Sequence, residues 1–489
     1  MPDRTFTIDE TTWNDLDMDE VVNIIDVCSS SVGKEYLRKS LKDISLDEGI
    51  LKTRSEKSEY LKTDKNLMTG FRKAFSNLGI SKKVSVRDYI FRLEEVKRQS
   101  NVKHIIMIVL LLVAIALIFI KPLIGIIGIV AMFAVNISTY FAYKNKIEGY
   151  FLSIKYFSAM VLCTGKIAAL KLQGTPFEED GTRLKELLKI FSSVKRGSWL
   201  ITNSVSGSLV DVFMDYVRML FHVDLIKFNN SVNTVMSHSD EADELFNILG
   251  EIELTVCINS FRDRFPDNCR PHFDGSTPDF SGLDFSELYH PLISDPVKNS
   301  LSASGSILLT GSNASGKSTF LKSIAINQIL AQSMYTVLAS EYHTSFCKVM
   351  SSMALTDNIL NNESYFVVEI KSLKRIFDEL GKVPVMCFVD EVLRGTNTKE
   401  RIAASSVILK KLSASNAMVF AATHDIELCS LLEGHMANYH FSETVTDTVT
   451  FDYKLKEGPS TSRNAIKLLD MYGFDKDIVE EAEKIATES

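Results

Sequence analysis

The chain has 489 residues, of which 45% are hydrophobic and 24% are charged, and its formal net charge is -8. This composition excludes wholesale disorder, a collagen-like repeat and a disulfide-stabilised miniprotein, and the net acidity argues against a surface built entirely to bind nucleic acid. The seven cysteines include no Cys-x-x-Cys pair, so we expect reduced thiols and no zinc site. A mean hydropathy of +0.06 is high for so charged a chain and indicates that apolar residues are concentrated in one segment.

The first hundred residues (1–100) are predicted to form an N-terminal helical region in which charge is unevenly distributed. Residues 1–26 hold one basic and eight acidic residues, whereas residues 52–98 hold thirteen basic and six acidic ones. A basic segment just before a membrane span most often contacts anionic lipid or fixes topology, and DNA is the main alternative partner. The acidic start lacks the basic and apolar stretches of a secretion signal, so we expect no export.

The apolar residues are concentrated at 105–135, a run whose single charge is Lys121. One helix of that length would reach about 46 Å, well beyond the roughly 30 Å hydrocarbon core of a bilayer. Two spans at about 105–120 and 123–143, joined by a turn at Lys121 and Pro122, fit better, and we predict a transmembrane helical hairpin over 101–145. Basic residues flank both ends, which predicts that all the soluble chain is cytoplasmic. A buried hairpin in a soluble core is the alternative.

Residues 146–270 are predicted to form a helical core and lever region. Leucine and phenylalanine recur there at helical spacing, as at Leu184, Leu187 and Phe191, and we interpret such stripes as core packing. Several prolines between 266 and 278 then mark a boundary. Beyond it, short β-like runs alternate with helices, which predicts an α/β domain over 271–489.

A phosphate-binding motif lies in this last domain. A short apolar strand at 306–310 leads into Gly-Ser-Asn-Ala-Ser-Gly-Lys-Ser-Thr and then into a helix, which is the context that the G-x-x-x-x-G-K-[ST] loop requires. Glycines let main-chain N–H groups approach phosphates, and the helix dipole favours the anion. Lys317 is predicted to reach the β and γ oxygens and Ser318 to hold Mg²⁺. The predicted nucleotide-binding residues are Gly311, Ser312, Asn313, Ala314, Ser315, Gly316, Lys317, Ser318 and Thr319.

Two further strand ends carry candidate catalytic groups. A buried-strand run at 385–389 ends in Asp390 and Glu391. Beside a phosphate loop, the first acid can hold Mg²⁺ through its water shell, and the second can polarise the attacking water. A third strand, 418–422, is followed by His424 at the sheet edge where nucleotides bind, so His424 can contact the γ-phosphate. The sequence therefore predicts ATP hydrolysis with Mg²⁺.

These motifs, with Asp-Glu-Val-Leu-Arg-Gly-Thr-Asn-Thr at 390–398, resemble the ATPase domain of the MutS family, the mismatch-repair ATPases, in order and spacing. Tyr-His-Pro-Leu-Ile at 289–293 is similar to the His-Pro element of that family, and residues 357–369 are similar to its signature segment. Residues 453–474 and the closing helix resemble its final strand and helix-turn-helix. The resemblance covers about 280–489 well, whereas over 30–265 it is architectural.

The resemblance implies a P-loop ATPase of the ABC type that clamps as a homodimer through its ATPase domains. It implies Glu391 as the general base, His424 as the γ-phosphate sensor and His290 as a nucleotide contact. Ser364 would contact the nucleotide held by the partner. The resemblance also implies binding of mismatched or branched DNA and a role in DNA repair.

The chain departs from the family pattern in several ways. Ser312 stands where the family usually has proline, and Leu393 where it has glycine. We expect no mismatch-recognition domain, and the predicted hairpin interrupts the helices where the family inserts its DNA clamp. Two hypotheses follow: a membrane-tethered MutS-like ATPase that binds DNA, or an ATP-driven membrane switch or transport-related ATPase that does not. An ordinary ABC transporter is disfavoured, because no Leu-Ser-Gly-Gly-Gln signature lies between Lys317 and Asp390.

Overall fold

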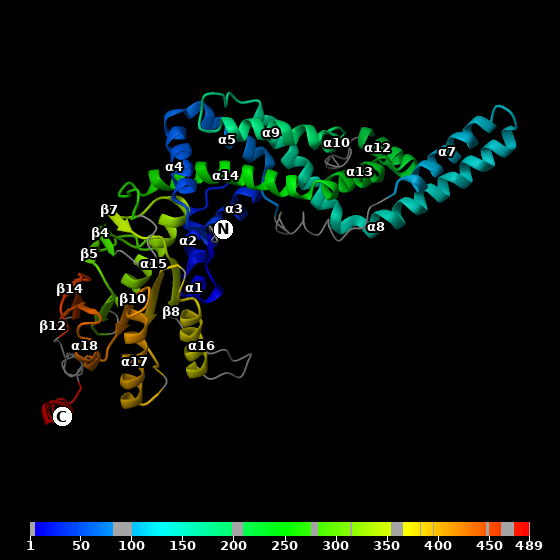
Figure 1. The fold of residues 1–489 in the computed structure, drawn as a ribbon. Helices are drawn as coiled ribbons and strands as arrows, with labels where there is room; N and C mark the ends of the chain where they lie inside the picture. The colour runs from blue at the N-terminus through cyan, green and yellow to red at the C-terminus, as the bar shows by residue number, and fades with distance from the viewer. Residues whose placement is uncertain are drawn as a thin grey trace. The chain divides into compact units, whose positions relative to one another are not determined.

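The computed structural model (Figure 1) describes residues 5–81, 100–197, 209–274, 282–312, 315–353, 365–381, 383–394, 396–445, 449–460 and 474–488. The chain forms two compact units. Unit 1 consists of three stretches, Met1–Ile25, Lys39–Ser55 and Phe261–Ser489. Unit 2 consists of two, Asp26–Arg38 and Glu56–Ser260. The region predicted as residues 1–100 is thus divided between both units.

Unit 2 is helical, which confirms the helical region predicted outside the ATPase domain. Its apolar helix faces enclose a shared core in which the rings of Phe157 and Phe191 meet edge to face, 5.0 Å apart. Leu184, Leu187 and Phe191 are all buried in it, so core packing is confirmed for this stripe, whereas the same prediction was wrong for Val212 and Phe213, which are 50% and 66% exposed. The helices that lie wholly or partly in unit 2 are α3 (Ser31–Lys42), α4 (Glu48–Thr63), α5 (Lys65–Leu78), α7 (Val102–Leu117), α8 (Pro122–Ala168), α9 (Glu178–Ile190), α10 (Ser192–Lys195), α12 (Leu209–Phe221), α13 (Val223–Ser237) and α14 (Ser239–Arg264).

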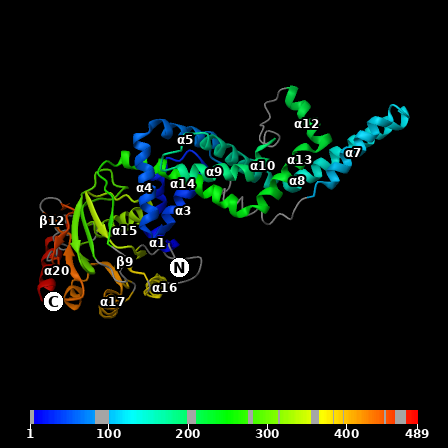
Figure 2. The same cartoon turned by 45° about the horizontal axis from the view of Figure 1, so that its top comes forward.

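Helices α7 and α8 form an antiparallel hairpin, and in both views the turn between them lies away from the other helices of unit 2 (Figures 1 and 2). The two helices pack closely: a Cβ atom at Gly128 would lie 3.1 Å from that of Ala114. Helix α8 continues to Ala168, well past the predicted end at 143. Among the described residues, α8 is the one helix long and apolar enough to cross a membrane, whereas α7 is shorter. Two membrane spans are therefore not confirmed and remain a prediction.

The hairpin exposes apolar side chains along its length and buries polar ones at its base. There Nδ1 of His104 lies 2.9 Å from Nδ1 of His222, and Nδ2 of Asn136 donates to the carbonyl oxygen of Leu220 over 2.8 Å. All three of these side chains are buried. The exposed apolar side chains include Ile105, Ile106, Val109, Leu110, Val113, Phe119, Leu123, Ile127 and Val130.

Unit 1 is built on a six-stranded sheet with the order β14-β11-β6-β10-β9-β8. The five strands from β11 to β8 run parallel, and β14 is antiparallel to β11. This architecture confirms the predicted α/β domain. The strands are β6 (Ile307–Thr310), β8 (Lys348–Ser352), β9 (Val385–Asp390), β10 (Ala417–Thr423), β11 (Ala437–His440) and β14 (Lys456–Glu457).

Helices cover both faces of this sheet. On one face, alternate residues of β9 and β10, such as Cys387 and Val419, pack with α16 (Tyr365–Asp378), α17 (Thr398–Ser413) and α18 (Glu427–Leu431). Helix α15 (Lys317–Met334), which follows the phosphate loop, packs against β8, β9 and β10 outside that cluster, on the other face. The parallel order brings the carboxyl ends of β6, β9 and β10 to one edge. A closing helix, α20, spans Lys476–Glu488.

A second sheet of unit 1 has the order β3-β7-β4-β5. Its strands are β3 (His272–Phe273), β4 (Leu283–Leu288), β5 (Asn299–Ala303) and β7 (Glu341–Thr344). Two small antiparallel pairs complete the unit: β1 (Thr5–Thr7) with β2 (Asp43–Ser45), and β12 (Glu443–Val445) with β13 (Val449–Phe451). Asn299, the first residue of β5, lines a cavity that is described below.

The acidic N-terminal segment, with α1 (Glu10–Asp15) and α2 (Met18–Ile25), packs on the large sheet of unit 1. Oδ2 of Asp15 accepts hydrogen bonds from Oγ of Ser351 over 2.7 Å and from the main-chain N–H of Met353 over 2.9 Å. Asp9 forms an ion pair with Arg375 on α16, and Asp17 forms one with Lys322 on α15 over 2.6 Å. Its carboxylates therefore neutralise basic groups of the same unit.

Candidate functional site

The phosphate loop connects β6 to α15, as predicted. Gly311 and Gly316 have φ values of 146° and 103°, a region that favours glycine. A Cβ atom at Gly311 would lie 2.8 Å from the carbonyl oxygen of Phe441, and one at Gly316 would lie 3.0 Å from the ring of Tyr453. Both glycines are thus required by conformation and by space. Two predicted loop residues, Asn313 and Ala314, lie outside the described residues.

Lys317 is the first residue of α15 and is held by its own loop. Its Nζ donates to the carbonyl oxygens of Gly311 and Ser312, each over 2.8 Å. The side chain is buried, and this burial lowers the pKa of the ammonium group while nearby carboxylates oppose the shift. An ammonium held by two carbonyl oxygens can exchange them for phosphate oxygens without moving far.

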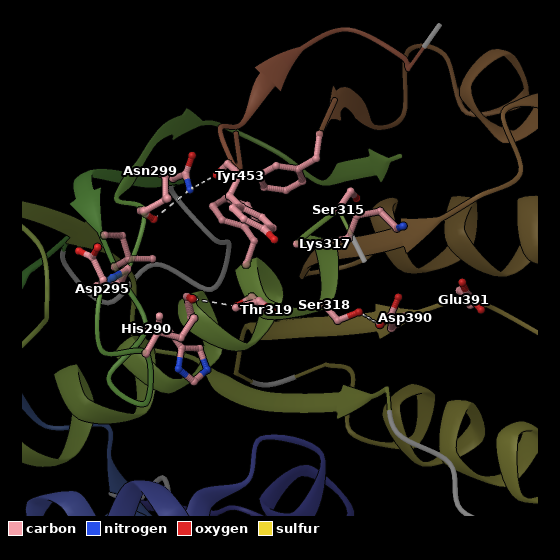
Figure 3. A pocket seen from close by; sticks show the side chains of 18 residues that line it. His290, Asp295, Asn299, Ser315, Lys317, Ser318, Thr319, Asp390, Glu391 and Tyr453 are labelled. Atoms are coloured by element: carbon pink, nitrogen blue, oxygen red, sulfur yellow. Dashed lines mark hydrogen bonds between the residues drawn. The ribbon is translucent and has the colours of Figure 1, made fainter. Parts of the chain in front are cut away.

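Ser318 and Asp390 are brought into direct contact from different elements. The hydroxyl of Ser318, at the start of α15, donates to Oδ2 of Asp390, the last residue of β9 (Figure 3). Burial raises the pKa of Asp390, and the hydrogen bond from Ser318 opposes this rise. A hydroxyl beside a carboxylate is a pair of hard oxygen donors of the kind that Mg²⁺ prefers, so the donor set fits that ion.

Glu391 and His424 also meet at this edge of the sheet. Nδ1 of His424, which follows β10, lies 3.3 Å from Oε1 of Glu391. Nε of Arg394 lies 2.6 Å from Oε2 of the same carboxylate. Asp425, beside the histidine, is held by the guanidinium of Arg401 through bonds of 2.6 and 2.9 Å. The predicted acid and histidine are thus close together, although the sequence did not indicate the two arginines.

A cavity of ≈ 490 Å³ adjoins these groups and is lined by Ser315, Gly316, Lys317, Ser318, Thr319, Asp390 and Glu391 at its polar end (Figure 3). His290 lines it as well, and its Nδ1 accepts the N–H of Leu292 over 3.2 Å. Burial lowers the pKa of His290 to about 4, so this imidazole is neutral at pH 7. Apolar and aromatic residues complete the lining, and the ring of Tyr453 lies beside Gly316 of the loop; these residues are Ile293, Pro296, Val297, Phe441 and Tyr453.

Several residues of the cavity were not predicted from the sequence. Asn299 on β5 holds the Tyr453 segment: its Nδ2 donates to the carbonyl oxygen of Tyr453 over 3.0 Å, and its Oδ1 accepts the N–H of Leu455 over 2.8 Å. Phe441 follows β11. These residues come from distant parts of the chain. Tyr453 begins the segment that resembles the family's final strand, but that resemblance did not indicate that its side chain lines the cavity, and Asn299 and Phe441 lie in no motif.

Ser364, predicted to contact the nucleotide of a partner chain, lies outside the described residues, immediately before α16. Glu369 lies in the segment that resembles the family's signature segment, and the sequence predicted no role for its side chain. Its Oε1 accepts the main-chain N–H groups of Leu393 and Arg394, just after Glu391.

Comparison with known proteins gives one family and many relatives. The family described as MutS domain V matches residues 307–489. The chain is 30% identical over 324 residues to MutS protein homolog 4 of Mus musculus, covering 62% of this chain and 33% of that protein. It is 26% identical over 272 residues to the DNA mismatch repair protein MutS of Natronomonas pharaonis, covering 53% and 31%. With the MutS protein of Streptococcus pneumoniae, 30% identity over 186 residues covers 37% and 22%.

The chain thus spans about a third or less of the length of these relatives. The 324-residue match is longer than the stretch 307–489, so similarity to that relative extends into residues before the phosphate loop.

Proposed function

We propose, from the match of residues 307–489 to the family described as MutS domain V, that this chain is an ATPase whose nucleotide cycle drives clamping of a dimer. Members of this family bind ATP with Mg²⁺, act as dimers and bind DNA. The observation that carries the proposal is the convergence of Lys317, Ser318, Asp390 and Glu391 on one cavity at the carboxyl edge of a parallel sheet.

Each residue of this cluster has a distinct task in the proposal. Lys317 leaves the carbonyl oxygens of its loop and contacts the β- and γ-phosphates. Ser318 and Asp390 would hold Mg²⁺, which supplies positive charge to offset the negative charge of the phosphates. The apolar part of the lining, at Val297 and Tyr453, receives the nucleobase, because an aromatic ring offers a stacking surface.

Hydrolysis in this proposal depends on Glu391 as the general base. The carboxylate takes a proton from water while the water oxygen forms a bond to the γ-phosphorus. The bond from that phosphorus to the oxygen of ADP breaks, which gives ADP and inorganic phosphate. His424, 3.3 Å from the carboxylate, contacts the γ-phosphate and reports its presence to the loop that carries Glu391.

Clamping would bring a second chain to the nucleotide through Ser364. The closing helix α20 (Lys476–Glu488) has apolar side chains that are exposed in the single chain, among them Ile478 and Ile485. Such a face supports a contact between two copies of the ATPase domain.

The membrane location is part of the same proposal. Within the part of the chain that the structure describes, nothing removes the apolar side chains exposed along α7 and α8 from water, and a lipid bilayer would do so. Basic residues at both ends of the hairpin support a cytoplasmic position for the soluble chain. This exposed hairpin also favours the second candidate, an ATP-driven membrane switch or transport-related ATPase without a DNA role.

Salt-dependent DNA binding by the full-length protein in detergent distinguishes the two candidates. The DNA candidate predicts binding to duplex, mismatched or junction DNA at low salt, weakening as salt rises because phosphate contacts release counterions. ATPase activity without binding to any of these DNAs at low salt would support the membrane switch. Absence of ATP hydrolysis by the wild-type protein would overturn both.

A further inference from the structure

The segment after Glu391 has a main-chain conformation that its residues do not favour. Glu391 and Leu393 have φ values of 56° and 59°, in the left-handed region that residues other than glycine seldom adopt. The side chain of Leu393 is nonetheless buried in the core beneath the sheet, beside that of Val392. A glycine at 393 would meet this conformation without strain, so a leucine there requires the surrounding structure to impose it.

Glu369 on α16 supplies such a constraint. The residue is 3% exposed, and Oε1 accepts the N–H of Leu393 and, over 3.4 Å, the N–H of Arg394. Burial raises the pKa of Glu369, and the two main-chain bonds oppose that rise. Burying a carboxylate costs free energy, and hydrogen bonds to main-chain N–H groups offset that cost while they fix the conformation of the main chain.

The rest of the segment is fixed from the other side. The N–H of Glu391 donates to the carbonyl oxygen of Ala422 on β10 over 2.9 Å, and the carbonyl oxygen of Val392 accepts from Ser405 on α17 over 3.1 Å. Glu369 thus holds the two residues that directly follow those held by β10 and α17. The side chain of Arg394, one of these two residues, forms an ion pair with Glu391, in which Nε lies 2.6 Å from Oε2 of the carboxylate.

We propose that Glu369 is a positioning residue for Glu391. By holding the N–H groups of Leu393 and Arg394, it imposes the left-handed turn and sets where Arg394 directs the carboxylate of Glu391. The inference rests on the proposed function, in which Glu391 takes a proton from water, and it adds the residue that aims that base.

Three variants of the full-length protein test this role. Glu369→Ala removes the acceptor, Glu369→Gln retains a carbonyl acceptor of similar reach, and Asp378→Ala removes an exposed acid from the same helix as a control. We expect Glu369→Ala to lower kcat by about 10- to 100-fold, as a small misplacement of a catalytic group does. The KM for ATP should change by less than about twofold, because Lys317 and Ser318 are untouched. Glu369→Gln should recover most of the kcat, and Asp378→Ala should equal wild type.

A second substitution separates positioning from general damage. Glycine adopts the left-handed conformation readily, so Leu393→Gly should lessen the need for Glu369. We expect the double variant Glu369→Ala with Leu393→Gly to have a higher kcat than Glu369→Ala alone. A purely additive loss in the double variant would contradict the inference.

Hydrogen–deuterium exchange tests the contact without any activity. In Glu369→Ala, the amides of Leu393 and Arg394 should exchange at least about tenfold faster, while those of β9 stay unchanged. Unchanged exchange or an unchanged kcat in Glu369→Ala, with Glu391→Gln inactive, would overturn the positioning role alone. Faster exchange in a protein whose wild type hydrolyses no ATP would instead overturn the proposed function and leave the contact established.

Discussion

The two compact units differ in how far they bury their most apolar segments. In unit 1, the apolar runs 307–310 and 385–389 become strands whose residues are all buried between helices. In unit 2, the equally apolar α7 and the first half of α8 leave Ile106, Leu112 and Ile127 more than half exposed. The comparison teaches that hydropathy alone does not say what covers a residue. The strands are covered by helices of the same unit, whereas no described residue covers these side chains of the hairpin.

Buried polar groups differ in the same way. In unit 1 they converge on a cavity, where the hydroxyl of Ser318 and the ammonium of Lys317 have partners that a ligand could replace. At the base of the hairpin, His104 and His222 bond to each other and His222 also to the carbonyl oxygen of Asn136, over 3.0 Å. The polar groups of the cavity in unit 1 can exchange their partners for a ligand, whereas those at the base of the hairpin hold its helices in place.

Charging the surface of the hairpin would break this contrast most strongly. Val113→Lys with Ile127→Lys places two ammonium groups on exposed positions, which would cost about 2.5–3.5 kcal/mol each inside a bilayer. We expect the double variant to leave the membrane fraction in a flotation assay while its ATPase activity is unchanged. The pair Val113→Leu with Ile127→Leu is the matched control. A charged variant that still floats with vesicles would show that these faces do not meet lipid.

Removing the base tests the chemistry of unit 1 alone. Glu391→Gln should lower ATP turnover by about 10²- to 10⁴-fold, because the amide cannot take the proton from water. Nucleotide binding should persist, since Lys317 and Ser318 remain, and phosphate release with equilibrium binding measures both. Glu433→Gln, an exposed acid of the same unit, serves as the control. Turnover near the wild-type rate in Glu391→Gln would exclude Glu391 as the base.

Opposite pH responses should separate the two units. Burial lowers the pKa of His290 in unit 1 to about 4, so the unfolded state binds more protons below pH 6.5 and unit 1 loses stability as the pH falls from about 6.5 toward 4. Burial raises the pKa of Glu253 in unit 2 to about 7, so unit 2 loses stability as the pH rises from about 4.5 to 7.

Each effect should be on the order of 2–3 kcal/mol, and exchange of amides in each unit at pH 5 and pH 7.5 measures it. Glu253 accepts the N–H groups of Ser29 and Ser30 over 2.6 and 3.1 Å, and Glu253→Gln should remove the response of unit 2 while retaining an acceptor. His290→Asn should remove that of unit 1. Equal responses of both units before substitution would contradict these assignments.

Mixing two inactive variants gives the smallest expected signal and tests the sharing of a site between chains. Ser364→Ala and Lys317→Ala homodimers should both be inactive, but a mixed dimer would keep one intact composite site. Random pairing in a 1:1 mixture should therefore restore about a quarter of the wild-type ATPase activity. No recovery, with mixed dimers detected by differential tags, would count against a role for Ser364 in the partner's site.

The convergence of Lys317, Ser318, Asp390 and Glu391 on one cavity could be predicted because it depends on short contiguous motifs. A glycine loop between strand and helix and two acids at a strand end each determine their own geometry, and parallel strands then bring them together. The contact between Asn299 and the Tyr453 segment could not be predicted, because it joins residues that are 154 positions apart in the chain. The left-handed Leu393 was equally hidden, because sequence shows a departure from glycine without showing what enforces the turn.

In unit 2 the limits were different. The turn near Pro122 was predictable because proline cannot continue a helix beyond its first turn. The continuation of α8 past 143 was missed because the prediction used the end of the apolar run as the end of the helix, although residues 144–168 favour helix as well. Likewise the acidity of residues 1–26 suggested a separate segment, whereas Asp15 is buried against Ser351 of the sheet.

The contact between Asp15 and Ser351 limits how the protein can be divided into fragments. The chain passes from one unit to the other after residues 25, 38, 55 and 260, so no single cut separates the units. A recombinant fragment beginning at 261 would lack Asp9 and Asp15, and would leave Arg375 and the hydroxyl of Ser351 without these acceptors. Residues 1–25 supplied in trans as a peptide should therefore stabilise such a fragment, and a truncation that removes Asp9 and Asp15 should weaken the packing around Arg375 and Ser351.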